Sequence, residues 1–341
     1  MVGLALIGTA CTGAGKQTST GEIDEDAIPV GAQTYTVDVD VPSPEGQKLQ
    51  ASVFLPVSLS VMPGDTVVFE NRSTEAPHTV TFLPKDAPPP EPYPLVTKTG
   101  TANPLLFAPC YTATAPAAGA EACPEAPAAV PPVYAGTGFW SSGALAPTTA
   151  AGAPHSVSLT VAPNIEPGSY NYTCALHPNM SGVLDVVASA DLRRSTAATA
   201  KKAQRQRRAV LAGAAQLAEP AVNGAVVNAG WGDATFAVNK FSPAEVRAKA
   251  GQTVTWKATS FEPHTVTFES PFLTPDDPGV LTPGGTKAGA RYSGGFAHSG
   301  LVGPQPRFAG ATFSLLFAKP GTYSYVCVLH PGMAGQVVVT D

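Results

Sequence analysis

Cysteine, histidine and methionine recur in this chain at one fixed spacing. Residues 167–182 read PGSYNYTCALHPNMSG and residues 320–335 read PGTYSYVCVLHPGMAG, so the pattern Cys-x-x-His-x-x-Met occurs twice. Each copy also has an upstream histidine, in the matching phrases EAPHTVTF and FEPHTVTF. A thiolate, two imidazoles and a thioether together form the ligand set of a blue-copper site. The two candidate sets are His78, Cys174, His177 and Met180 in the first copy and His264, Cys327, His330 and Met333 in the second.

These residue types favour copper over zinc. One thiolate and two imidazoles suit both Cu(I) and Cu(II), and the thioether is a soft, weak axial ligand. Zinc is the main alternative, but structural zinc is usually held by tetrahedral sets of cysteine and histidine. Of the chain's six histidines and four methionines, four histidines and two methionines fall in the matched positions. We therefore predict two type 1 copper ions per chain, which would exchange single electrons with little movement of their ligands.

The segments around these ligands predict β-strands. Residues 54–71 parallel residues 241–258, and in each a glycine-bearing turn separates short runs rich in strand-forming residues. The phrase HTVTF then follows as a strand with the first ligand, and a Pro-Gly turn leads into each Tyr-x-Tyr-x-Cys strand. Because long amphipathic helical patterns are almost absent from both copies, we predict an all-β fold.

Both copies resemble the cupredoxins of the plastocyanin/azurin group, with a short ligand loop of the amicyanin type. The resemblance implies a Greek-key β-sandwich of about eight strands, with copper near one end. It also implies one-electron transfer through the exposed edge of His177 or His330, with Leu176 and Leu329 near an apolar docking patch.

One position departs from the family pattern. Many relatives have an asparagine directly after the upstream histidine, and that asparagine tethers the two ligand-bearing loops. This chain has Thr79 and Thr265 there. The sequence therefore leaves the rigidity of the sites and their redox potentials open.

The repeat divides the chain into two domains, for which 341 residues give enough length. We expect Greek-key sandwiches at 31–189, the first domain, and at 221–341, the second domain. The first domain contains a Pro/Ala-rich insertion at about 84–147, which lengthens the separation between its first two ligands. Residues 1–30 are expected to form a signal-like N-terminus and tail, and residues 190–220 a basic linker.

Three cysteines lie outside the ligand sets. Cys110 and Cys123 fall in the insertion, where we expect a disulfide that stabilises the fold by about 3 kcal/mol; two free thiols are the alternative. Cys11 follows the short apolar run VGLALIGTA, which resembles the end of a bacterial lipoprotein signal, although no Lys or Arg precedes it. That resemblance implies lipidation at Cys11 and an extracytoplasmic location, in the periplasm or on the outer face of the membrane. The alternative is an unpaired thiol in a disordered tail.

The linker is basic and rich in helix-forming residues, so we predict a helix at about 196–217. Such a helix is about 33 Å long, which would prevent direct electron exchange if it held the domains apart. We expect a solvated tether; contact with an acidic redox partner or an anionic lipid is the alternative. Its positive residues are Arg193, Arg194, Lys201, Lys202, Arg205, Arg207 and Arg208.

Several function classes are disfavoured. The net charge of −5 argues against a nucleic-acid binder. The sequence also lacks a run of eighteen apolar residues, which argues against a spanning helix. Oxidases built from cupredoxin domains bind their catalytic copper through His-x-His motifs, which this chain lacks. His155 and His298 do not recur between the copies, so we expect surface or structural roles for them.

We therefore expect a copper electron carrier, not an enzyme, that acts with unidentified redox proteins. Two alternatives stay open. One is a copper-holding or copper-delivery protein that uses the same sites. The other is an oxidoreductase with a type 2 copper at a domain or subunit interface, using His155 or His298.

Overall fold

The structure is a computed structural model. It describes residues 31–84, 93–124, 133–177, 179–274, 277, 279–304, 308 and 310–341. The predictions for the N-terminal 30 residues, including lipidation of Cys11, lie outside the described residues.

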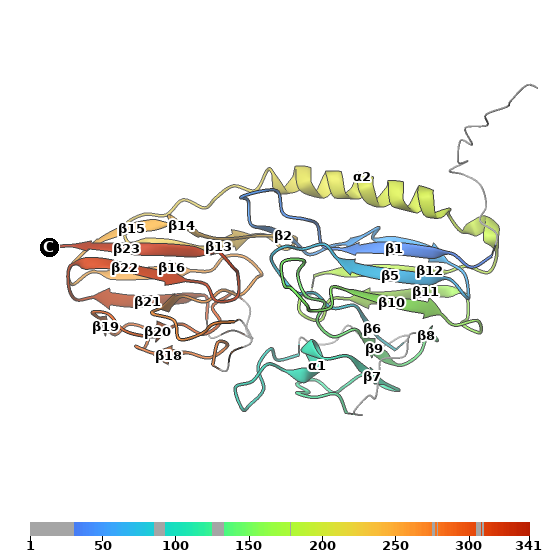
Figure 1. Ribbon diagram of the computed structural model, residues 1–341, viewed down its shortest axis with the longest axis horizontal. Helices are drawn as coiled ribbons and strands as arrows, with labels where there is room; N and C mark the ends of the chain where they lie inside the picture. Colours follow the sequence, from blue (N-terminus) through green and yellow to red (C-terminus); the bar gives the residue numbers. More distant parts are fainter. Residues whose placement is uncertain are drawn as a thin grey trace, which may run out of the picture.

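The first domain is a sandwich of two sheets, as predicted (Figure 1). One sheet has the order β3–β1–β5–β10–β8, and the other has the order β4–β12–β11–β6–β9–β7. The strands are β1 (Thr34–Val39), β3 (Phe54–Leu55), β4 (Ser58–Val61), β5 (Thr66–Asn71), β6 (Thr81–Phe82), β7 (Cys110–Thr112), β8 (Val133–Tyr134), β9 (Phe139–Ser141), β10 (Ser156–Val161), β11 (Gly168–Thr173) and β12 (Ser181–Val186).

The second domain repeats this architecture. Its sheets have the orders β19–β21–β16–β13–β14–β2 and β15–β23–β22–β17–β20–β18. The strands are β13 (Val226–Gly232), β14 (Phe236–Ser242), β15 (Glu245–Lys249), β16 (Thr253–Lys257), β17 (Thr267–Phe268), β18 (Gly284–Gly285), β19 (Arg291–Tyr292), β20 (Ala297–His298), β21 (Thr312–Phe317), β22 (Gly321–Val326) and β23 (Ala334–Thr340). The chain is thus an all-β protein of two sandwiches.

The two cores are built from equivalent aromatic residues. Alternate residues of β5 are buried, as expected for a strand with one face on a core. Phe69 on this strand packs edge-on against Tyr172, with ring centroids 5.2 Å apart. Trp256 packs in the same way against Tyr325 at 5.1 Å. Both tyrosines lie two residues before a candidate ligand cysteine, so each core directly supports its site.

A short strand of the first domain belongs to a sheet of the second. β2 (Leu49–Ala51) pairs antiparallel with β14, with Gln50 opposite Ala237. In the second domain the seven-residue β14 is the antiparallel partner of β13, whereas in the first domain the antiparallel partner of β1 is the two-residue β3. The chain between β1 and β3 therefore carries β2 across to the other domain, and the two sandwiches are joined by backbone hydrogen bonds.

The insertion extends both sheets of the first domain. It contains the short helix α1 (Pro104–Phe107) and the strands β7, β8 and β9, which add to the sheet edges. β18, β19 and β20 occupy the same sheet positions in the second domain, so the insertion is an enlarged version of a shared feature. Cys110 and Cys123 form a disulfide within it.

The linker forms a 3₁₀ turn, η1 (Ala190–Leu192), and the helix α2 (Thr196–Ala214), which begins at an N-cap serine. The helix lies along the first domain and does not separate the domains (Figure 1). Ala203 is buried in an apolar cluster with Leu55, and Arg207 forms an ion pair with Asp38. The expected solvated tether is therefore wrong, because α2 packs on the protein itself. Within the described residues, no helix is both long and apolar enough to cross a bilayer.

The approach to α2 is anchored by a buried ion pair, which gives a test of this packing. Arg193 is 6% exposed and donates to the fully buried Asp65 at 2.7 Å. Arg193→Ala leaves that carboxylate without its cation, so we expect the free energy of unfolding to fall by about 3 kcal/mol in urea denaturation. Arg208→Ala is the control, since Arg208 is exposed and, among the described residues, its hydrogen bond is to Gln204 on its own helix; a change of about 0.5 kcal/mol or less is expected. Equal effects of the two changes would contradict the anchoring role.

Candidate metal centres

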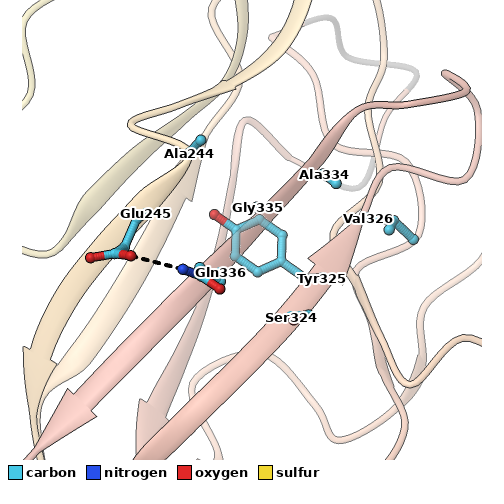
Figure 2. Close-up of a pocket in the computed structure, with 8 residues that line it drawn as sticks. All are labelled: Ala244, Glu245, Ser324, Tyr325, Val326, Ala334, Gly335 and Gln336. Carbon is cyan, nitrogen blue, oxygen red and sulfur yellow. Dashed lines mark hydrogen bonds between the residues drawn. The ribbon is translucent and has the colours of Figure 1, made fainter.

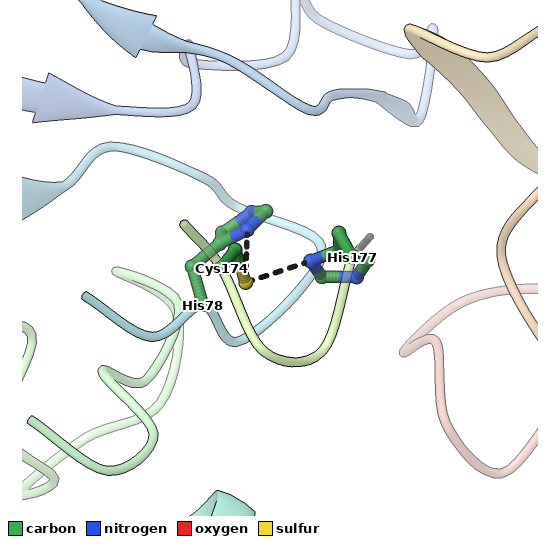
Figure 3. Close-up of side chains that lie close together, drawn as sticks. All are labelled: His78, Cys174 and His177. Carbon is green, nitrogen blue, oxygen red and sulfur yellow. Dashed lines mark hydrogen bonds between the residues drawn. The ribbon is translucent and has the colours of Figure 1, made fainter. Parts of the chain in front are cut away.

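The first candidate site brings His78, Cys174 and His177 together (Figure 3). The Cys174 Sγ lies 3.3 Å from Nδ1 of His177 and 3.8 Å from Nδ1 of His78. All three side chains are buried. Two imidazole nitrogens and a sulfur thus converge on one point, although the upstream histidine lies 96 residues from the cysteine.

The second candidate site repeats this geometry with His264, Cys327 and His330. The Cys327 Sγ lies 3.3 Å from Nδ1 of His330. The two histidine rings have centroids 4.9 Å apart at 51°, against 4.6 Å and 53° in the first site. Nδ1 of His264 is buried and has no hydrogen-bond partner among the described residues. An unpaired buried nitrogen is costly, so this atom is placed for a ligand that the protein itself does not supply.

The methionines close the ligand loops through their backbones. The backbone N–H of Cys174 donates to the carbonyl of Met180 at 2.9 Å, and the Met180 N–H donates to the His177 carbonyl at 3.0 Å. The equivalent bonds of Cys327, His330 and Met333 have the same lengths. Both methionines are buried in the core clusters that contain the cysteines. Each Cys-x-x-His-x-x-Met segment is therefore a closed loop at the end of a strand.

Thr79 and Thr265 tether the loops that their family counterparts tether with asparagine. The Thr79 backbone N–H donates to the Cys174 sulfur at 3.3 Å, and its hydroxyl accepts from the N–H of Ala175 at 2.7 Å. Thr265 makes the same two bonds, at 3.3 Å to Cys327 and 2.8 Å from Val328. A threonine hydroxyl thus replaces the asparagine side chain, and both sites keep a rigid link between their ligand loops.

The upstream histidines are held by main-chain pairing. His78 exchanges backbone hydrogen bonds with Leu145 at 3.0 and 2.7 Å, and His264 does so with Val302 at 2.9 and 2.8 Å. Leu145 lies at the end of the insertion, which explains how a long insertion is compatible with an intact site.

The electrostatics favour thiolates. Burial opposes ionisation of the thiols, but the adjacent histidines outweigh it and lower the pKa of Cys174 and the pKa of Cys327 well below the ordinary value. Thiolate is the form that binds metal. Burial also opposes charge on His177, yet Cys174 and Glu262 raise its pKa to about 10. Each site therefore supplies a thiolate, and binding of a metal ion would release the ring proton of His177.

The outer contacts of the upstream histidines differ between the sites. Nε2 of His78 lies 3.1 Å from Oδ2 of Asp40, whereas Nε2 of His264 lies 3.3 Å from the hydroxyl of Ser260. Burial lowers the pKa of both rings, but the bond to Asp40 gives His78 a raised pKa while that of His264 is lowered. Asp40 has a positive φ of 64°, and Gly230 takes this place on β13 with φ 70°. A side chain at Gly230 would collide with Nε2 of His264 at 2.0 Å.

The loop histidines are not exposed, so the expected surface edge is wrong for both. His177 is 4% and His330 is 2% exposed, because each domain presents its ligand loop to the other. Leu176 is buried within the core cluster of the first domain, which also includes Leu301 and Phe308 of the second domain. Leu329 packs against both cores. The expected docking patches are therefore covered within the chain.

One carboxylate lies between the two loop histidines. Oε2 of Glu262 is 3.0 Å from Nε2 of His177, and Oε1 is 3.5 Å from Nε2 of His330. Gln50 on β2 donates to Oε2 at 3.0 Å and is itself held by Asn239 at 3.3 Å. Burial opposes ionisation of Glu262, but the two histidines hold its pKa well below the usual range.

Sequence reasoning missed Asp40, Gln50 and Glu262. A comparison of the two copies could have indicated Asp40, because the equivalent position on β13 is Gly230. Glu262 could have been noted too, since its counterpart two residues before the ligand histidine is Ala76. Gln50 has no such signal, because its role depends on the pairing of β2 with the other domain.

The remaining histidines lie apart from these centres. His298 is buried, donates from Nε2 to the Val280 carbonyl at 2.8 Å and receives the Thr267 hydroxyl at Nδ1 at 2.8 Å. His155 is exposed at the start of β10. Among the described residues, the two clusters above are the only groups of three with metal-ligating geometry. The pocket in Figure 2 lies over β15, β22 and β23 of the second domain and contains no histidine or cysteine, so it adds no ligand.

The chain is similar in sequence to known copper-binding proteins. Residues 233–340 match the model of the copper binding proteins of the plastocyanin/azurin family. Amicyanin-alpha of Methylorubrum extorquens is 38% identical over 111 residues, which cover 33% of this chain and 73% of that protein. Amicyanin of Paracoccus denitrificans is 34% identical over 100 residues, covering 29% of this chain and 58% of the relative. A Cu(I) structure of a methionine-to-alanine variant of amicyanin matches at 27% identity with a TM-score of 0.23, over 37% of this chain and 89% of that one.

Sandwich fold and ligand geometry together define a cupredoxin. The chain belongs to the plastocyanin/azurin family of copper-binding proteins. The buried thiolate–imidazole sets, and the unpaired Nδ1 of His264 in particular, fit a copper ion.

The contact of His78 with Asp40 gives a test of the difference between the sites. When Nδ1 of His78 binds metal, Nε2 carries the proton and donates to the carboxylate, which strengthens the imidazole as a donor. In Asp40→Asn, an amide NH₂ would face this N–H, so we expect Cu(II) affinity of the first domain to fall by about 10- to 100-fold. Competition titration against a chelator measures this in a Cys327→Ser background, where only the first domain binds.

Ser260→Ala in a Cys174→Ser background is the matched control, because it removes only a neutral hydrogen bond in the second domain. A smaller loss of affinity is expected there. If Asp40→Asn bound Cu(II) as tightly as the parent chain, the outer carboxylate would have no role in the site.

Proposed function

We propose that this protein is an electron-transfer protein with one type 1 copper ion in each domain. The observation that carries the proposal is the repeated cluster of a buried cysteine with two histidines, whose ligand atoms lie within 4.8 Å of one another in both domains. When bound, copper supplies a one-electron couple between Cu(I) and Cu(II). The eight ligands would be His78, Cys174, His177 and Met180 with His264, Cys327, His330 and Met333.

The surroundings of the ligands support an electron carrier. Each cysteine sulfur already accepts a backbone N–H, each ligand loop is closed by its own hydrogen bonds, and each upstream histidine is fixed by backbone pairing. Ligands that hardly move keep the reorganisation small when an electron arrives or leaves. The loops are also buried, which excludes water from both centres.

The disulfide between Cys110 and Cys123 supports an extracytoplasmic location, because such bonds persist in oxidising compartments. We propose attachment to the membrane through lipidated Cys11. The partners would be redox proteins, since a one-electron carrier needs a donor and an acceptor.

Visible and EPR spectra with copper analysis test the proposal. We expect two copper ions per chain and an intense blue absorption on loading with Cu(II), because the thiolate–Cu(II) bond gives this colour. Cys174→Ser and Cys327→Ser should each halve the absorption and the stoichiometry, and the double variant should abolish both. A colourless protein with two bound coppers would refute the type 1 assignment, and copper release on reduction would favour a copper-holding or delivery protein.

A further inference from the structure

The two loop histidines meet across the domain interface through Glu262. In both domains Nδ1 of the ring faces the cysteine sulfur at 3.3 Å, so the opposite edge, with Nε2, is turned away from the site (Figure 3 shows the first). These two edges are the ones that contact the oxygens of Glu262, at 3.0 and 3.5 Å. One carboxylate therefore links a ligand of each centre.

The proton positions in this contact follow from the ligand positions. A neutral histidine that binds metal through Nδ1 carries its proton on Nε2. His177 and His330 are then both donors, and an ionised carboxylate with two oxygens can accept from both. Gln50 adds a third donor to the same carboxylate at 3.0 Å. The charge of Glu262 is thereby satisfied in a buried place where an unpaired charge would be very costly.

Among the described residues, Glu262 is the one carboxylate that contacts both loop histidines. Ala76 occupies the position of Glu262 in the first domain, two residues before His78. A second acid there would bring two negative charges into one buried contact, which would be destabilising. The two domains therefore differ at this position, and only the second supplies a carboxylate to the contact between the loop histidines.

We propose that His177, Glu262 and His330 form an internal electron path, by which the two centres exchange an electron within one chain. This rests on the proposed function, since it requires copper in both domains. In the exchange, the centre that gives the electron is oxidised by one unit and the other is reduced by one unit. Both histidines keep their Nε2 protons, so no net proton moves.

The path also assigns a different role to external partners. In this chain the loop histidines and Leu329 lie between the domains, so a redox partner cannot reach either ring directly. Electrons from outside must enter at another surface, and the histidine edges serve exchange within the molecule.

The experiment injects an electron into the first domain and follows its arrival in the second. His155 is the one exposed histidine of the six, since the other five are buried. A ruthenium polypyridyl photoreductant can therefore be attached to His155. The backbone carbonyl of His155 accepts a hydrogen bond from the N–H of Asn71. The side chain of Asn71 donates to the carbonyl of Leu145, and Leu145 pairs through its backbone with His78. The label is thus connected to the first centre.

The Met180→Gln change supplies the driving force and the spectral difference. An amide oxygen is a harder ligand than a thioether, so it favours Cu(II), lowers the potential of the first centre and alters its spectrum. In this background, a light flash that excites the photoreductant should first reduce the first centre and remove its blue absorption. That absorption should then return as the absorption of the second centre is lost. The rate of this second phase is the readout.

Glu262→Gln is the deciding variant, because it keeps the shape of the side chain. Its amide oxygen can accept from one histidine only, and its NH₂ group faces the N–H of the other. We expect the transfer rate between centres to fall by about tenfold or more as that contact opens. In the Cu(I) form, which is diamagnetic, NMR should show that one of the two Nε2–H protons exchanges faster with water.

Lys48→Ala is the matched control. Lys48 crosses the same interface: it donates to the carbonyl of Pro331 at 2.9 Å and pairs with Glu75 at 3.6 Å, but it bonds neither loop histidine. The rate of electron transfer between the centres in Lys48→Ala should equal that of the parent chain. Small-angle scattering should show the same domain arrangement in all variants. An unchanged rate in Glu262→Gln with both centres loaded would overturn the path alone, whereas a parent chain that never becomes blue would overturn the proposed function.

Discussion

The contact between the two ligand loops depends on one buried charge. Glu262 is 5% exposed, and a carboxylate in such a place is tolerated only when donors surround it. Its donors come from three distant parts of the chain, namely Gln50, His177 and His330. The carboxylate is satisfied only when both ligand loops and β2 are in position. The charge thus fixes the orientation of the domains with the same contacts that orient the loop histidines.

The two domains share their ligands but differ in what surrounds them. Asp40 contacts His78, the upstream histidine of the first domain. In the second domain, the neutral Ser260 contacts His264. Glu262 comes from the second domain only, and its oxygens lie at unequal distances from the two rings. Outer contacts change the donor strength of a ligand histidine. The two candidate centres, which share the same set of ligand residues, therefore have chemically different surroundings.

Local and repeated patterns made much of this structure predictable. The strand punctuation predicted the sandwiches, the alanine-rich segment predicted α2, and the doubled motif predicted the two clusters. The interface was not predictable in the same way. Glu262 lies 212 residues from Gln50, and no periodicity records such a contact. The position of α2 was misjudged because its charges suggested solvent, whereas Arg207 and Lys202 bond residues of the first domain.

The covered ligand loops change how electron exchange between two such domains should be understood. Separate carriers must find each other by diffusion and orient their small docking faces at each encounter. Here those faces are joined by the β2–β14 pairing and by the Glu262 contact, with α2 packed along the first domain. Linking two partners replaces a bimolecular search with a fixed, high effective concentration. In the proposed exchange the orientational cost is met once, during folding, and each electron would cross the same contact of His177, Glu262 and His330.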